Sequence, residues 1–152
     1  MTDTQVLDTL DAAFGDCPRP EHFTNHTHCC ECAEHDETLR GRDRETLGMA
    51  EVGNAAYDPI CFVTDAGFRY YFPALARLVL HRPSVEEPWY LEQLLFHLND
   101  RDSPQKRRQA CSAAQRAAVA SFLRHVLETR ALLVAAHRCE DDLRDAIALW
   151  TE

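Results

Sequence analysis

Histidine and cysteine side chains are concentrated in one short stretch of this 152-residue chain. Four of the 7 cysteines and four of the 8 histidines lie between residues 17 and 35. They are Cys17, His22, His26, His28, Cys29, Cys30, Cys32 and His35. Thiolate sulfur and imidazole nitrogen are ligands that zinc accepts readily in proteins. The composition therefore predicts a metal-binding segment over residues 17–36, with zinc as the ion.

The spacing of these residues indicates which of them bind the ion. Cys29 and Cys32 form a Cys-x-x-Cys pair, whose two thiolates can bind one ion from a single turn. His35 follows three residues later and adds an imidazole, and the six residues between His22 and Cys29 leave enough chain for His22 to fold back. We therefore predict four ligands, which are His22, Cys29, Cys32 and His35. The alternatives for the fourth position are Cys17, His26, His28 and His97.

Two other interpretations of the same residues remain open. If residues 28–39 form one helix, then His28, Cys32 and His35 lie on one face of it, at i, i+4 and i+7. Cys29 and Cys32 are also spaced as a redox dithiol of the thioredoxin type, which normally follows a strand and begins a helix. No strand pattern precedes residue 29, so the sequence favours metal binding over redox chemistry.

An ion in this segment has either a structural or a catalytic role. A catalytic zinc keeps one position for water, and a nearby carboxylate commonly acts as general base. Glu31, Glu34 and Asp36 are close in sequence, but carboxylates are abundant in a chain with 25 Asp and Glu residues. The chain has no His-Glu-x-x-His motif, and the predicted ligands are rich in sulfur. We therefore expect a structural zinc.

The elements that must position this segment are predicted to be helices. Apolar residues recur at helical spacing over residues 4–14, after Thr64, over residues 91–98, from Ser112 to residue 133 and over residues 143–150. Gly15 is expected to end the first helix in a left-handed conformation. Thr64 is a candidate N-cap, and capping boxes at Ser84 and Ser112 mark two further helix starts.

The remaining stretches are less regular. Residues 34–48 are predicted as a solvated helix or two short turns, residues 60–63 as a lone strand or extended segment, and residues 99–108 as a polar loop. Pro73 is expected to kink the helix that contains it. Together these patterns predict a mainly α, single-domain helical bundle over residues 1–152, with an irregular Cys/His-rich zinc-binding insert near its N-terminus.

Several conspicuous side chains are best explained as structural. His97 lies between two apolar residues and is predicted to be a hydrogen-bonded core histidine. The basic triplet at residues 106–108 is expected in a solvated loop. A cluster of aromatic residues is expected in the core rather than as a platform for bases, namely Phe68, Tyr70, Tyr71 and Phe72.

Charge and hydropathy exclude whole classes of function. The formal net charge is -9, so the surface repels phosphate backbones and we expect no nucleic-acid partner. No apolar run approaches the roughly 20 residues that span a bilayer, so we expect no membrane partner. The first residues carry no basic or apolar pattern of a secretory signal, which predicts a cytoplasmic protein with reduced thiols.

The stretches from Pro20 to Asn25 and from His28 to Asp36 resemble the signature of an uncharacterised family of small bacterial proteins. That signature reads His-Phe-Thr-Asn, then His-Cys-x-x-Cys-x-x-His-Asp. The resemblance continues through residues 67–75 and 89–98, so it covers most of residues 20–125. The family has no established activity. The resemblance implies a bacterial origin and implies that the His/Cys run is a family feature.

Two classes of function fit these observations. The first is a small zinc-binding protein that acts by binding another protein, as a regulator or inhibitor. The lack of a recognisable catalytic set favours this class over an enzyme. The alternative is a metal-dependent hydrolase with a zinc-bound water and Glu31 or Glu34 as its base. The sequence leaves the oligomeric state open.

Overall fold

The computed structural model describes residues 1–81, 85–99 and 105–152, and these residues form helices joined by turns. The helices are α1 (Asp3–Phe14), α2 (Cys30–Arg40), α3 (Met49–Val52), α4 (Asp65–Leu80), α5 (Tyr90–Leu98), α6 (Gln105–Ala110), α7 (Ala113–Thr129), α8 (Ala131–Ala136) and α9 (Glu140–Thr151), with the 3-10 turns η1 (Ala55–Tyr57) and η2 (Pro59–Phe62). The described part of the chain contains no strand and only one isolated bridge, between Thr24 and Val63. The prediction of a mainly α, single-domain protein is confirmed.

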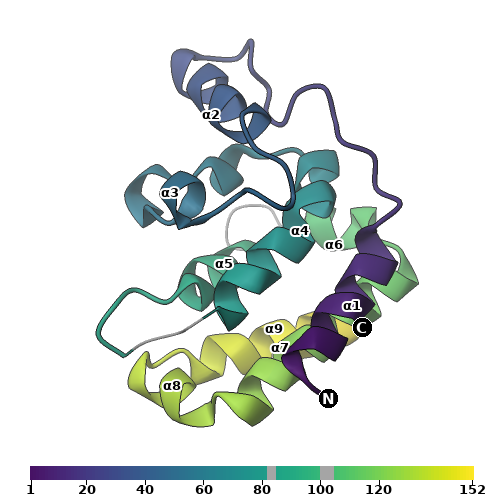
Figure 1. Ribbon diagram of the computed structural model, residues 1–152, viewed down its shortest axis with the longest axis vertical. Coiled ribbons are helices and arrows are strands. Elements are labelled where there is room, and N and C mark those ends of the chain that lie inside the picture. The colour runs from purple at the N-terminus through teal and green to yellow at the C-terminus, as the bar shows by residue number, and fades with distance from the viewer. Residues whose placement is uncertain (82–84, 100–104) are drawn as a thin grey trace.

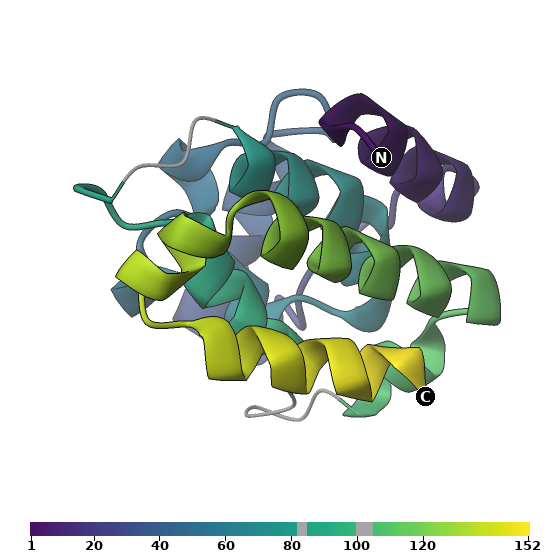
Figure 2. The same cartoon turned by 90° about the horizontal axis from the view of Figure 1, so that it is seen from below.

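The larger part of the molecule is a bundle in which α7 lies between α1 and α9, and α4 packs against α1 and α5 (Figures 1 and 2). The apolar faces of these helices meet in one core. Within it, the rings of Phe14 and Phe72 lie 5.3 Å apart, and those of Phe72 and Phe122 lie 6.1 Å apart in an edge-to-face contact. The core thus joins helices from the first and last parts of the chain.

The predicted helix starts at Thr64 and Ser112 are confirmed. Each side chain accepts a hydrogen bond from the backbone N–H three residues later, as N-caps do. The prediction for Gly15 is wrong, because its φ of -60° is right-handed. Its N–H still bonds the Asp11 carbonyl, so the chain leaves α1 without a left-handed residue.

Pro73 lies inside α4, and the helix continues past it to Leu80. Neighbouring elements hold α4 at its middle and at its C-terminal end. The Tyr71 hydroxyl contacts the carbonyls of Leu39 and Arg42, and the Trp89 indole donates to the carbonyl of Val79. Most of α4 is buried, including the four aromatic residues predicted for the core. Tertiary packing therefore keeps this segment helical despite the proline.

Three other stretches differ from their predictions. Residues 60–62 belong to η2, because Asp58 caps that turn and Pro59 occupies its first position. Only Val63 is extended, and it forms an isolated bridge with Thr24 and no strand. The apolar stripe that begins after Ser112 is divided at Arg130, where α7 ends and α8 begins. Residues 34–48 are only partly solvated, since Leu39 and Leu47 are core residues.

The segment after α4 also differs in its boundaries. Helix α5 begins at Tyr90, with Trp89 as its N-cap, so the helix starts later than the predicted capping box. Ser84 itself lies outside the described residues. The predicted polar loop, residues 99–108, includes the first four residues of α6. Arg107 of the basic triplet is buried, and its guanidinium donates to the Ile60 carbonyl at 3.0 Å.

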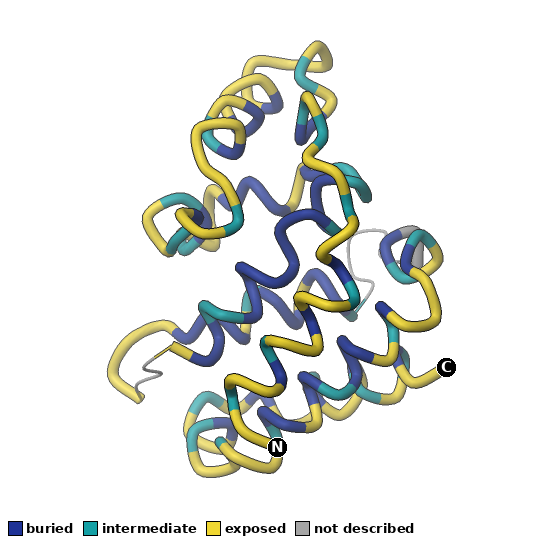
Figure 3. The backbone as a smooth tube through the Cα atoms, turned by 45° about the vertical axis from the view of Figure 1, so that its right-hand side comes forward, coloured by how far each residue is buried: buried dark blue, intermediate teal, exposed yellow. Residues whose placement is uncertain are grey.

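The Cys/His-rich segment and α2 form one end of the molecule along its longest axis, and the N-terminus lies toward the other end (Figure 1). Helix α2 packs against η2, and its outer side is exposed while its inner side is buried (Figure 3). Among the described residues, no helix is both long and apolar enough to cross a membrane.

Candidate metal centre

The Cys-x-x-Cys pair lies at the N-terminus of α2. Cys29 is the N-cap, and its sulfur accepts a hydrogen bond from the Cys32 N–H at 3.4 Å. The two sulfurs are 3.3 Å apart, and Nδ1 of His28 is 3.7 Å from the Cys32 sulfur. These three ligand atoms all lie within 4.8 Å of one another. The structure thus brings two thiols and one imidazole together at a single point.

The electrostatics of this helix end favour a thiolate. The N–H of Cys32 points at the Cys29 sulfur, and with help from His28 it lowers the pKa of Cys29 to about 7. The neighbouring Cys29 sulfur raises the pKa of Cys32. A thiol must lose its proton to bind a metal ion. Cys29 therefore reaches its ligand form near neutral pH, and an ion would have to draw the proton from Cys32.

The loop before α2 is fixed by buried polar contacts. The Asp36 carboxylate accepts hydrogen bonds from the backbone N–H groups of Phe23 and Thr24, at 2.6 and 3.3 Å. The Thr24 hydroxyl donates to the Cys32 carbonyl at 2.6 Å. The Phe23 carbonyl in turn accepts from the Thr64 N–H at the start of α4. These bonds position the loop, and with it the first turn of α2, relative to the core.

A second group of possible ligands lies in the same segment. Nδ1 of His22 is 2.7 Å from Oδ2 of Asp36, and the rings of His22 and His26 are stacked 3.6 Å apart. Ligand atoms of these three residues also lie within 4.8 Å of one another. Burial opposes ionisation of Asp36, but the hydrogen bonds from His22 and the two backbone N–H groups outweigh it and lower the pKa of the carboxyl.

His35 belongs to neither group. Its side chain is fully buried between Tyr57 and Phe62, with ring centroids 4.3 and 4.8 Å away. Its Nε2 is 3.4 Å from a carboxylate oxygen of Glu31, and its Nδ1 has no hydrogen-bond partner among the described residues. The ring therefore forms part of the contact between α2 and the turns η1 and η2.

The structure thus distributes the four predicted ligands over three places. Cys29 and Cys32 are together, His22 lies with His26 and Asp36, and His35 packs against aromatic rings. The ligand set stays a prediction, but His28, one of the alternatives, is the imidazole beside the thiols.

Two further alternatives have other contacts. The Cys17 sulfur is 3.3 Å from the Gln115 amide, and Nε2 of His97 is 2.8 Å from Asp58. His97 is a buried, hydrogen-bonded histidine, as predicted.

Sequence reasoning missed the role of Asp36, which it treated as a solvated carboxylate. Asp36 is buried and holds the loop that carries the ligands. A signal was present in the spacing, since Asp36 follows Cys32 by four residues and therefore lies on the same face of a helix.

The nearby glutamates are not directed at the thiols. Glu31 contacts His35, and the Glu34 carboxylate accepts a hydrogen bond from the Tyr57 hydroxyl. This bond raises the pKa of Tyr57 to about 12. Both carboxylates are therefore engaged by side chains other than the thiols.

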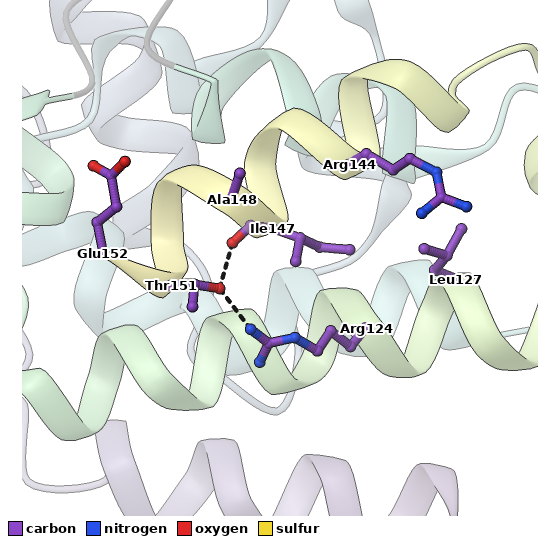
Figure 4. A pocket seen from close by; sticks show the side chains of 7 residues that line it. All are labelled: Arg124, Leu127, Arg144, Ile147, Ala148, Thr151 and Glu152. Carbon is purple, nitrogen blue, oxygen red and sulfur yellow. Dashed lines mark hydrogen bonds between the residues drawn. The ribbon is translucent and has the colours of Figure 1, made fainter.

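An open groove of about 540 Å³ lies elsewhere, between α7 and α9 (Figure 4). Two hydrogen bonds of 2.6 Å lie along it, one from the Arg124 guanidinium to the Thr151 hydroxyl and one from that hydroxyl to the Ile147 carbonyl. No cysteine or histidine lines this groove. It therefore offers none of the ligands that the sequence predicts, and the candidate site stays at α2.

A protein-family model described as a family of unknown function (DUF6714) matches residues 4–152. No curated protein and no solved structure matches the chain. The family match agrees with the expectation of an uncharacterised family. The bacterial origin and the His/Cys signature of that family stay predictions.

Proposed function

Since the chain belongs to this family of unknown function, we propose its function from the side chains of the site: it is a zinc-binding protein. His28, Cys29 and Cys32 bind the ion, which fixes the Cys/His-rich segment against α2. One observation carries the proposal, namely that two sulfurs and one imidazole nitrogen lie within 4.8 Å of one another at the start of one helix.

The distances between these atoms support zinc. A tetrahedral zinc ion, with Zn–S near 2.3 Å and Zn–N near 2.0–2.1 Å, places two sulfurs about 3.8 Å apart and sulfur and nitrogen about 3.6 Å apart. The observed distances are 3.3 Å between the sulfurs and 3.7 Å between the Cys32 sulfur and His28. Only small shifts are needed. Thiolate ligands also disfavour magnesium and calcium, which prefer oxygen.

A structural role for the ion is supported by the carboxylates. In zinc hydrolases a carboxylate within hydrogen-bond reach of the zinc-bound water commonly acts as its base, and Glu31 and Glu34 make other contacts. His22 remains the preferred fourth ligand. Its Nδ1 is 2.7 Å from Asp36, so Nε2 is the nitrogen that would bind the ion while the carboxylate orients the ring. Metal-dependent hydrolysis is therefore the weaker proposal for this site.

The outer face of α2 indicates what such a protein presents to a partner. Glu31, Glu34 and Glu37 are exposed at intervals of three residues, so they form one acidic stripe. An ion bound at the N-terminus of α2 holds this helix against the preceding segment, so it also fixes which way the acidic stripe faces. We propose that the protein acts through this face on another protein with a basic surface, as a regulator or inhibitor.

Metal analysis of the reduced, untagged protein by mass spectrometry tests the zinc site. We expect one zinc ion per chain, near-complete loss in Cys29→Ser and in Cys32→Ser, and strongly weakened binding in His28→Ala. Cys30→Ser is the matched control, because Cys30 is exposed and lies outside the ligand groups of the described residues. Wild-type protein with only trace zinc would overturn the proposal.

One observation favours a second candidate function. An exposed cysteine at a helix N-terminus, 3.3 Å from a buried one, is also the arrangement of a redox dithiol. In that case the two thiols of zinc-free protein would reduce oxidised glutathione to two glutathione molecules and form a Cys29–Cys32 disulfide. Mass spectrometry of the intact chain would show the loss of two hydrogens in the wild type and none in Cys32→Ser.

A further inference from the structure

A separate cluster of metal-binding side chains lies between η2 and α5. Asp58 is the N-cap of η2, Cys61 is within η2, and His97 lies near the end of α5. One ligand atom from each of these residues lies within 4.8 Å of the other two. Three different ligand types therefore converge from two elements that are distant in sequence.

The carboxylate and the imidazole of this cluster are held in place. Oδ2 of Asp58 is 2.8 Å from Nε2 of His97 and 3.1 Å from the amide nitrogen of Gln93. Its Oδ1 accepts a hydrogen bond from the backbone N–H of Ile60 at 2.9 Å. The side chains of Asp58 and His97 are 3% and 1% exposed. The bonds from Ile60 and Gln93 orient the carboxylate, as outer hydrogen bonds do at metal sites. The contact between Asp58 and His97 would have to open for an ion to bind.

Cys61 connects these buried groups to the surface. Unlike Asp58 and His97, it is exposed, and it lines a pocket of about 350 Å³ together with Gln93, Phe96 and Glu92. An ion can thus reach the cluster from solvent, and one side of the cluster faces the pocket. A purely structural Asp–His pair does not require a cysteine at this position.

A buried hydroxyl beside the cluster is a further polar group at this place. The Tyr90 hydroxyl has no hydrogen-bond partner among the described residues, although the residue is only 2% exposed. Burial is the main reason that the pKa of Tyr90 is raised, and the charges of Asp58 and Cys61 add to the effect. A buried polar group without a partner costs free energy.

We propose that Asp58, Cys61 and His97 form a second binding site for a divalent ion of the zinc class, with one coordination position open to the pocket. The carboxylate and a Cys61 thiolate together balance the charge of such an ion. Ligand atoms about 2.0–2.1 Å from a tetrahedral ion are about 3.3 Å apart, so the 2.8 Å contact of Asp58 and His97 needs to widen by about half an ångström.

This site differs in character from the one at α2. It has one sulfur in place of two, and it adjoins a pocket that Glu92 also lines. Three protein ligands and an open position are the arrangement of zinc ions that bind an exchangeable water or a small anionic ligand. The proposal does not depend on zinc at Cys29 and Cys32.

Cobalt(II) titration of the reduced protein tests this site, because a cobalt ion bound by thiolate shows sulfur-to-metal charge-transfer absorption. Ions bound only by His22, His26 and Asp36 do not contribute to that band. The double variant Cys29→Ser/Cys32→Ser keeps Cys61 as the one thiolate ligand of three, so about one third of the wild-type absorption should remain. Adding Cys61→Ser to this variant should remove the remaining absorption. Cys30→Ser is the control and should leave the band unchanged.

Two results separate the failure of this proposal from the failure of the first. If the α2 site does not bind cobalt but the second site does, the double variant keeps the whole wild-type band, and Cys61→Ser abolishes it. If the second site does not bind cobalt, Cys61→Ser leaves the wild-type band intact, and the double variant shows no charge-transfer band. Circular dichroism of each variant checks that it is folded.

Alkylation of the folded wild-type protein gives an independent measurement. Zinc should slow the reaction of iodoacetamide with Cys61 by at least about tenfold, since a metal-bound thiolate is a poorer nucleophile. His97→Gln should remove this protection, while alkylation of Cys30 stays unaffected by zinc. Equal alkylation of Cys61 with and without zinc would overturn the proposal and favour a reactive thiol without a metal.

Discussion

At the scale of single residues, the ring of His35 has a role that substitution can separate from metal binding. It fills the space between Tyr57 and Phe62, where it is fully buried. We expect His35→Ala to lower the free energy of unfolding by about 2–4 kcal/mol, since it leaves a cavity among these rings. We expect the zinc content of the folded protein to stay unchanged. Urea unfolding and metal analysis of the same preparation check both values.

The phenylalanine substitution at this position is the matched control. His35→Phe keeps an aromatic ring between Tyr57 and Phe62 and removes a buried nitrogen that has no partner among the described residues. The free energy of unfolding of His35→Phe should therefore be much closer to the wild-type value than that of His35→Ala is. Loss of zinc from both variants, with the fold retained, would instead support His35 as a ligand.

Much of the candidate site was predictable at this scale, because ligand types and local spacing are visible in the sequence. The Cys29–Cys32 pair is close in space, as its spacing requires. The choice among the histidines was not predictable. It depends on where η1 and η2 place Tyr57 and Phe62, and those aromatic rings enclose His35 from another part of the chain.

At the scale of elements, Asp3 joins the start of α1 to the junction of α7 and α8. Its two oxygens accept hydrogen bonds from the Arg130 guanidinium at 2.8 and 2.7 Å, and His125 Nε2 is 2.7 Å from the first. The bonds from Arg130, followed by those from His125, lower the pKa of Asp3 from 3.8 to about 2, although burial opposes the shift.

This shift predicts how stability depends on pH. The unfolded chain binds a proton at Asp3 more readily than the folded protein does, so the contribution of Asp3 is complete above about pH 4 and is lost as the pH falls toward about 2. We expect Asp3→Asn to be less stable than the wild type at neutral pH. The difference should shrink as the medium is acidified over this range. Urea unfolding at a series of pH values measures it.

Asp8→Asn is the control for this series, since Asp8 is an exposed carboxylate of the same helix. Its stability should follow that of the wild type at each pH. A constant difference between Asp3→Asn and the wild type down to pH 2 would contradict the assignment of the pH dependence to this carboxylate.

The helix starts at Thr64 and Ser112 were predictable at the scale of elements, whereas the start of α5 and several other boundaries were not. The N-caps at Thr64 and Ser112 depend on residues three positions apart, so the local sequence contains the signal. The apolar stripe that follows Ser112 is divided at Arg130, whose guanidinium bonds Asp3 and the Leu80 carbonyl in distant parts of the chain. No local pattern contains that information.

At the scale of the whole molecule, Trp150 connects the last helix to the middle of the chain. Its side chain is 1% exposed, and its indole N–H donates to the Leu98 carbonyl at 3.0 Å. We expect Trp150→Ala to lower the free energy of unfolding by about 3–5 kcal/mol, because a large buried ring and a buried hydrogen bond are lost together. Thermal unfolding followed by circular dichroism measures the effect.

The exposed Leu132 of α8 provides the comparison for this prediction. Leu132→Ala removes apolar atoms that are already in water, so the melting temperature should change little. A loss of stability in Leu132→Ala as large as that in Trp150→Ala would show that α8 has a partner in solution, such as a second copy of the chain.

The contacts of α1 with the C-terminal half have a consequence for the synthesis of this protein. Asp3 bonds Arg130, which is 127 positions later, and the Ala13 carbonyl accepts from Gln115, which is 102 positions later. On the ribosome, α1 emerges well before α7, the helix against which it packs. The apolar face of α1, with Val6, Leu10 and Phe14, therefore remains incompletely covered until α7 has emerged. Nascent chains stalled before residue 113 should bind a chaperone that recognises apolar helices, and chains stalled after the last helix should release it.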